Sequence, residues 1–106
     1  MNRGEIRWYT IPRSNKRRPV LILTRDSAIP YLGEVTIAPL TTTIRDIPTE
    51  VVLDRGDGLL RESAINLDHV QTISKGRIGD LITTLDARRM DAVRDALLFA
   101  MGFPGS

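Results

Sequence analysis

A continuous apolar run lies near the start of the chain, where residues Pro19–Thr24 read P-V-L-I-L-T. The run is too short for a typical helix and is rich in β-branched residues, which is typical of a strand buried on both faces. We therefore expect it at the centre of a sheet. Apolar and polar residues nearly alternate on either side of it, at Glu5–Ile11 and Glu34–Leu40, which predicts two half-buried strands. Pro39 should mark the place where the second of these leaves the ladder, because proline has no N–H to donate.

Further short segments follow at the spacing of a small all-β barrel or sandwich. These expected strands are Thr49–Leu53, Ser63–Leu67, Val70–Ile73 and Arg77–Ile82. From Asp86 onward the apolar residues instead recur at the three-and-four spacing of an amphipathic helix, with Asp86 as its N-cap and Gly102 at its end. Six or seven short strands followed by one helix predict an α+β fold, and the length favours a single domain over residues 1–106.

The residue inventory excludes several mechanisms. The chain has no cysteine, so disulfides, thiolate zinc sites and cysteine nucleophiles are absent. His69 is the single histidine, which excludes a His–His acid–base pair, and a structural role for it is the more common one. The carboxylates show no spacing that suggests a two-metal cluster, and the glycines match neither a P-loop nor a dinucleotide fingerprint. We expect neither a metal nor a cofactor.

The start of the chain bears on its location. It reads M-N-R-G-E-I-R-W, with charges where a signal peptide needs an apolar run. No stretch approaches the ~18–20 apolar residues of a membrane span. We therefore expect a cytoplasmic protein without a membrane partner.

The cations cluster in the first expected loop, Ile11–Arg18, although the net charge is only +2. Such clusters are typical of phosphate binding, but a solvated basic loop is an equally good interpretation. RNA can be cut by its own 2′-hydroxyl if cations and hydroxyl donors stabilise the charge on the phosphorane. Arg18 and the hydroxyls of Thr41–Thr43 suit that chemistry, although basic loops and threonine turns also occur in proteins that cleave nothing.

Five sequence features in order resemble the MazF/PemK toxin family. They are R-G-E-I-R-W, R-R-P-V-L-I-L, T-I-A-P-L-T-T, R-E-S-A-I-N-L-D-H-V-Q-T-I-S-K-G-R-I-G and a helical tail, and together they span about Arg3 to Gly102. The resemblance implies a homodimer of small SH3-like antiparallel β-barrels, each with a C-terminal helix, the CcdB/PemK-like fold. It also implies a sequence-specific, metal-independent endoribonuclease toxin, an mRNA interferase. Such an enzyme cuts single-stranded RNA, leaves a cyclic phosphate, and is inhibited by a cognate MazE-like antitoxin.

The resemblance also implies roles for individual residues. Arg18 matches the family's catalytic arginine, and we expect it to stabilise charge rather than act as a base, because arginine stays protonated. Thr41 matches the catalytic threonine, whose hydroxyl would hold the scissile phosphate, the alternative being a strand-end hydroxyl that caps its own backbone. The further RNA-binding candidates are Lys16, Arg17, Thr42, Ser63, Asn66, Asp68, His69 and Arg77. The antitoxin-binding candidates are Arg13, Lys16, Arg17 and Arg18.

Some residues depart from the family pattern, and two other functions remain open. His69 stands where many relatives have glutamine, and Gln71 where they have arginine, which is expected to alter base preference. Trp8 has a face on which a base can stack, but a core position is the more common one for a single tryptophan on a strand. A gyrase-binding toxin of the same fold without nuclease activity is the main alternative, disfavoured because the tail F-A-M-G-F-P-G-S lacks a tryptophan. The second alternative is a catalytically silent barrel that only binds RNA or an antitoxin.

Overall fold

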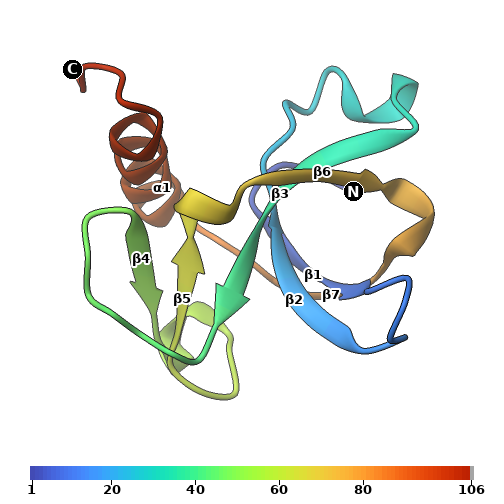
Figure 1. Ribbon diagram of the computed structural model, residues 1–106, viewed down its shortest axis with the longest axis horizontal. Coiled ribbons are helices and arrows are strands. Elements are labelled where there is room, and N and C mark those ends of the chain that lie inside the picture. Colours follow the sequence, from blue (N-terminus) through green and yellow to red (C-terminus); the bar gives the residue numbers. More distant parts are fainter. Residues whose placement is uncertain (106) are drawn as a thin grey trace.

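The computed structural model describes residues 1–105, which form seven strands and one α-helix (Figure 1). The strands are β1 (Glu5–Thr10), β2 (Arg17–Ile22), β3 (Glu34–Thr41), β4 (Glu50–Leu53), β5 (Ser63–Asn66), β6 (Gln71–Ser74) and β7 (Ile78–Thr84). Helix α1 (Ala87–Met101) follows them, and the connections contain four 3-10 turns, η1 (Ile29–Tyr31), η2 (Arg55–Asp57), η3 (Leu67–His69) and η4 (Lys75–Arg77). The predicted α+β layout is confirmed. No helix in this range is long and apolar enough to cross a membrane.

Strand β3 joins the two halves of the sheet. One of its edges pairs with β2, which pairs with β1, which in turn pairs with β7, all antiparallel. The other edge pairs with β6 through Glu34–Ile37 and then with β5 through Leu40 and Thr41. Strand β4 lies outermost beyond β5, so the strand order is β4-β5-β3-β2-β1-β7. The sheet curves into a barrel-like shape that stays open between its end strands (Figure 1).

The predicted end of β3 at Pro39 is wrong. Pro39 pairs with Val20, and the strand continues through Leu40 and Thr41, which pair with β5. On the β5–β6 edge Pro39 lies between the residues that pair with β6 and those that pair with β5. A residue without an N–H is tolerated there because the strand changes its partner at that point.

Strand β2 begins two residues earlier than expected and also ends two residues earlier. Arg17 and Arg18 therefore lie on a strand, and only Arg13 and Lys16 of the basic cluster remain in the β1–β2 loop. The reason is tertiary pairing, because Arg17 and Arg18 are the register partners of the last two residues of β1. A strand position fixes the direction of the Arg18 side chain more closely than a loop would.

The core consists of two clusters of buried aliphatic side chains, and β2 contributes to both. Leu21 belongs to the larger cluster, whereas its neighbours Val20 and Ile22 belong to the smaller one. This alternation confirms that the apolar run is a central strand buried on both faces. Helix α1 covers the larger cluster with Val93 and Ala96, the two residues of the helix that are buried.

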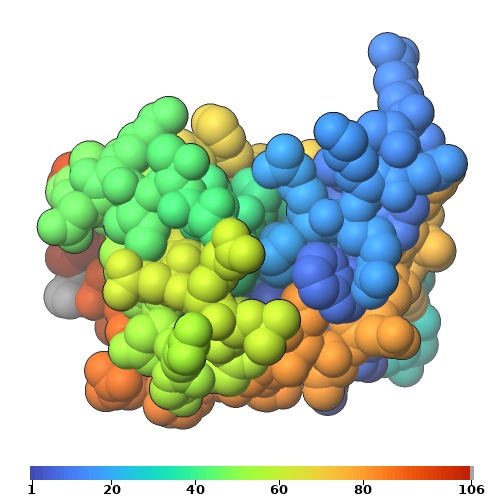
Figure 2. Space-filling model, turned by 90° about the horizontal axis from the view of Figure 1, so that it is seen from below, coloured from blue at the N-terminus to red at the C-terminus, as the bar shows by residue number. Residues whose placement is uncertain are grey.

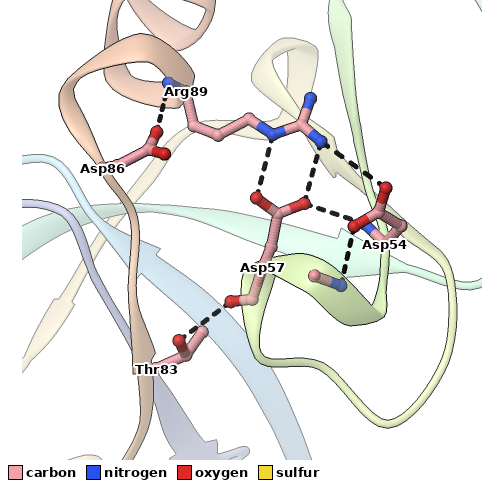
Figure 3. A network of polar contacts seen from close by, with 6 residues as sticks. Asp54, Asp57, Thr83, Asp86 and Arg89 are labelled. Carbon is pink, nitrogen blue, oxygen red and sulfur yellow. Dashed lines mark hydrogen bonds and ion pairs between the residues drawn. The ribbon is translucent and has the colours of Figure 1, made fainter.

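Helix α1 begins and ends where the sequence predicts. The Asp86 carboxylate accepts a hydrogen bond from the backbone N–H of Arg89 at 2.9 Å, which caps the N-terminus. Gly102 ends the helix in the left-handed region, with a φ of 77°. The Arg89 side chain also reaches back to the β4–β5 turn, where its Nε and Nη2 donate to the two carboxylate oxygens of Asp57, each at 2.9 Å (Figure 3).

Asp57 is held from three sides in this network. The backbone N–H of Asp54 donates to its carboxylate at 2.9 Å, and Thr83 Oγ1 donates to its backbone carbonyl at 2.9 Å (Figure 3). Burial by itself would raise the pKa of Asp57, but the hydrogen bonds from Arg89 and from the Asp54 backbone outweigh it, so the pKa is lowered. The ion pair thus fastens α1 to the turn that precedes β5.

Candidate functional site

The two proposed catalytic residues lie side by side because β2 and β3 are neighbouring antiparallel strands. Val20 of β2 faces Pro39 of β3 in the register. Arg18 and Thr41 each lie two residues further along their strands, and side chains two residues apart on a strand point to the same face, so both lie on the face that Val20 and Pro39 share. Both side chains line two adjacent hollows of about 290 and 340 Å³.

Arg18 is the cation of this pair. Its side chain is exposed and, within residues 1–105, it takes part in no ion pair and no side-chain hydrogen bond. A guanidinium carries five N–H donors and is suited to bind two oxygens of one phosphate group. The arrangement leaves those donors available to an anion in the hollow.

The Thr41 hydroxyl both caps its own backbone and keeps a donor. Its Oγ1 accepts a hydrogen bond from the backbone N–H of Thr43 at 3.1 Å, which is the local capping contact that the sequence left open as the alternative. A hydroxyl has one donor in addition to its acceptor lone pairs. The contact therefore fixes Oγ1 at the mouth of the hollow and leaves its O–H free to donate to a phosphate oxygen.

A third hollow, of about 340 Å³, continues the groove away from Arg18 and shares Thr42 and Ser63 with the second. Figure 2 shows this face, with the β1–β2 hairpin in blue and the β3–β4 loop in green on either side and the segment before β5 in yellow-green. The third hollow is mainly apolar, with Trp8, Leu59 and Leu60 in its lining. We call the three hollows together the β2–β3 groove.

Trp8 lies at the apolar end of this groove. It is half-buried and belongs to neither core cluster, so the interpretation of it as a core residue is wrong. The guanidinium of Arg17 lies 4.6 Å from the centre of its ring, in a cation–π contact. Arg17 therefore covers one part of the tryptophan, and the remaining surface lines the hollow.

Four of the other predicted RNA-binding residues line the groove as well. Thr42 is exposed, and Ser63 is buried with its hydroxyl donating to the carbonyl of Arg61 at 3.3 Å. Asn66 and His69 lie at the opposite, polar end. Asn66 caps η3, and His69 is an exposed residue of that turn, beside a strand as expected.

The remaining predicted residues lie elsewhere. Arg77 is in η4, which follows β6, and does not line the β2–β3 groove. The Asp68 carboxylate is engaged by the hydroxyl of Thr49 at 2.6 Å, and it does not line the groove either. Arg13 and Lys16 are exposed residues of the β1–β2 loop and line none of the three hollows.

Two residues that the sequence analysis did not single out complete the polar end of the groove. Arg45 and Glu50 line the same hollow as Arg18 and Thr41. Arg45 follows the threonine run by two residues, and a cation next to a row of hydroxyls was the available signal. Glu50 gave no such signal, because its contact with the loop is made only in the folded chain.

The described part of the chain brings together no group of three or more His, Cys, Asp or Glu side chains of the kind that holds a metal ion. The site is instead a groove with three arginines, Arg18, Arg45 and Arg61, and several hydroxyls along its length. This arrangement suits the binding of a phosphodiester and the stabilisation of negative charge on it. A metal-free reaction stays a prediction.

Comparisons with known proteins match nearly the whole chain. Residues 2–101 match the family model of the PemK-like, MazF-like toxin of type II toxin–antitoxin systems. The chain is 43% identical over 100 residues to the probable endoribonuclease MazF5 of Mycobacterium tuberculosis, over 93% of this chain and 91% of that protein. Among solved structures, the M. tuberculosis toxin MazF-mt6 has a TM-score of 0.87 and 38% identity, covering 95% of this chain and 99% of that one. An endoribonuclease in complex with its cognate antitoxin, from mycobacterial species, has a TM-score of 0.88 and 27% identity, covering 100% and 99%.

Proposed function

The chain belongs to the PemK-like, MazF-like toxin family of type II toxin–antitoxin systems, and from this premise we propose that it cuts single-stranded RNA in the β2–β3 groove. It is an RNA endonuclease toxin of the MazF type, and the relatives favour this activity over the gyrase-binding alternative. The observation that supports the location is that Arg18 of β2 and Thr41 of β3 line the same two hollows.

The reaction that fits this pair is transfer of the phosphodiester to the neighbouring 2′-hydroxyl. The 2′-oxygen attacks phosphorus and loses its proton to solvent, the bond from phosphorus to the 5′-oxygen breaks, and the 5′-oxygen takes up a proton. The products are a 2′,3′-cyclic phosphate and a free 5′-hydroxyl. The phosphorane carries an additional negative charge, which the Arg18 guanidinium stabilises while the Thr41 hydroxyl donates to a non-bridging oxygen. Sequence selectivity is assigned to the walls of the groove, where Asn66 and His69 present polar groups to bases.

The proposed assembly is a homodimer that a MazE-like antitoxin inhibits. One structural relative is an endoribonuclease in complex with its cognate antitoxin. An extended acidic antitoxin segment would find four cations on the β1–β2 hairpin, namely Arg13, Lys16, Arg17 and Arg18. Since Arg18 is also proposed to hold the scissile phosphate, such a segment would block the RNA path by occupying the same cation.

The direct test is cleavage of a long single-stranded RNA by the purified protein in excess chelator. Arg18→Ala and Thr41→Ala are each expected to reduce kcat/KM by about 10²–10³, the loss measured when one donor that stabilises the transition state is removed. Thr41→Ser keeps the hydroxyl and is expected to retain most of the activity. Arg88→Ala, which removes an exposed cation of α1 that has no ion-pair partner within residues 1–105, is the matched control.

Each result of this experiment has a definite meaning. Site-limited cutting in chelator, with a cyclic phosphate end and a strong loss in both alanine variants, supports the reaction and both residues. Intact RNA with the unaltered protein would contradict the nuclease function. If both alanine variants still cut RNA, the nuclease function would stand and the assigned site would be refuted.

A further inference from the structure

The β3–β4 loop, residues 42–49, carries a cation that the site assigned so far does not use. Arg45 lines the hollow of about 290 Å³ together with Arg18, Thr41 and Thr43. Its side chain is exposed, and in the part of the chain that the structure describes its guanidinium makes no ion pair and no hydrogen bond. The guanidinium of Arg45 thus contributes no internal contact to the fold, although it stands on the wall of the groove.

The loop beneath Arg45 is nevertheless firmly held, and the residue that holds it is Glu50. One oxygen of its carboxylate, Oε1, accepts hydrogen bonds from the backbone N–H groups of Arg45 at 2.9 Å and Asp46 at 3.1 Å. Asp46 has a φ of 55°, in the left-handed region that a residue other than glycine enters only at a cost. Hydrogen bonds to an ionised carboxylate are about twice as strong as neutral ones, and these two offset that cost.

Glu50 is itself fixed to the sheet. It is the first residue of β4, is half-buried, and pairs with Asn66 of β5. Its carboxylate is used on the backbone of the loop, and it forms no ion pair with the guanidinium of Arg45. The result is a loop held to the barrel by these two hydrogen bonds, which presents a guanidinium without an ion-pair partner within residues 1–105 in the same hollow as Arg18.

We propose that Arg45 binds an RNA phosphate next to the scissile one, and that Glu50 is the positioning residue that holds Arg45 there. The inference rests on the proposed function, since it concerns the same groove. Arg18 and Thr41 take the scissile phosphate, and Arg45, on the opposite wall, takes its neighbour along the strand. The apolar end at Trp8 suits the stacking of a base, whereas the polar end offers the Arg45 guanidinium to the charged backbone beside the groups of Asn66 and His69 that face base edges. Glu50 contacts no RNA and acts through the loop.

Binding of an RNA that cannot be cut, with a 2′-deoxynucleotide at the attacking position, tests this by its salt dependence. Each phosphate contact on a single strand contributes about −0.7 to the slope of log K against log salt. Arg45→Ala is therefore expected to make the slope shallower by about 0.7 and to weaken binding at low salt by about fivefold, as for one exposed ion pair. Arg45→Lys keeps the charge and should keep the slope. Arg88→Ala, on α1, should change neither quantity.

Cleavable RNA gives a second, independent readout for Arg45. A phosphate that does not react is bound equally in the ground state and the transition state, so Arg45→Ala is expected to raise KM and leave kcat nearly unchanged. Arg18→Ala should instead lower kcat. An Arg45→Ala variant with unaltered salt slope and KM would overturn the assignment of Arg45, even if the protein cuts RNA as proposed. A protein that neither binds nor cuts RNA would refute the proposed function and this inference with it.

The positioning role of Glu50 is tested by combining substitutions. Glu50→Gln keeps an acceptor oxygen in place, so Arg45→Ala should have its full effect on the slope in that background. In Glu50→Ala the loop loses its anchor, so adding Arg45→Ala should change the slope little further. Both Glu50 variants lose the same negative charge from the groove, which makes Gln the matched control for Ala. An equal effect of Arg45→Ala in the two backgrounds would contradict the positioning role.

Discussion

The ion pair between Arg89 and Asp57 is expected to be a major tertiary contact of the C-terminal helix. Arg89→Met keeps an unbranched side chain of similar length and removes the guanidinium. The Asp57 side chain is only 8% exposed and would lose two hydrogen bonds of 2.9 Å, retaining the one from the Asp54 backbone. Leaving a buried carboxylate short of donors costs about 1–3 kcal/mol or more, and Arg89 itself is partly exposed. We expect the free energy of unfolding to fall by about 2–3 kcal/mol.

Urea unfolding at matched protein concentration measures this change. With a slope of roughly 1–3 kcal/mol per molar urea, the midpoint should fall by about 1 M while the slope itself stays the same. Arg88→Met is the control, since Arg88 is the neighbouring exposed cation on the same helix. A double-mutant cycle with Asp57→Asn isolates the pairwise coupling. If Arg89→Met and Arg88→Met both lower the free energy of unfolding by less than about 0.5 kcal/mol, the ion pair does not anchor the helix.

The same pair predicts how stability depends on pH. The pKa of Asp57 is lowered in the folded protein below its ordinary value of 3.8, so the folded state favours the ionised carboxylate. The contribution of the ionised Asp57 carboxylate to the free energy of unfolding is therefore fully present above the pKa of the unfolded state. It is lost as the pH falls through the lower pKa of the folded state. The stability difference between the unaltered protein and Asp57→Asn should be constant near neutral pH and shrink below about pH 4. A difference that stays constant down to the acid unfolding transition would refute the linkage.

Two further predictions concern the antitoxin and the β4–β5 turn. Reversing the charges of Lys16 and Arg17 to Glu should weaken binding of the cognate antitoxin by at least tenfold and reduce its salt dependence in an equilibrium binding titration; unchanged values would exclude this surface. Gly58→Ala should cost about 1–3 kcal/mol in the same urea assay, because φ is 93° there and the added Cβ would collide with Thr83 Oγ1. A Cβ added at Gly33 would have no other atom within 4 Å, so Gly33→Ala should leave the free energy of unfolding nearly unchanged.

Local sequence patterns were sufficient for the elements whose signals lie within a few residues. The caps of α1 at Asp86 and Gly102 are in place because capping uses backbone groups of the adjacent turn. The central position of β2 followed from its continuous apolar run, because a strand buried on both faces needs apolar residues at successive positions. The resemblance to the toxin family is confirmed by the family match over residues 2–101.

The candidate site was predictable only in part. Arg18 and Thr41 were named through the family resemblance, but it is the antiparallel pairing of β2 with β3 that brings them to the same hollows. Patterns within the chain placed Arg18 on a loop and ended β3 at Pro39, and both predictions are wrong. In each case the strand extends because a distant segment offers hydrogen-bonding partners, which no local pattern records.

The sequence by itself predicted six or seven short strands, the final helix, the limits of that helix and the family. Only the tertiary structure decided which side chains meet: Arg45 beside Arg18 in one hollow, and Arg89 on Asp57, 32 residues away. The physical reason is that periodicity and capping are encoded over one or two turns of chain. Contacts between strands and loops depend on register and on the curvature of the whole sheet, which many distant residues set together.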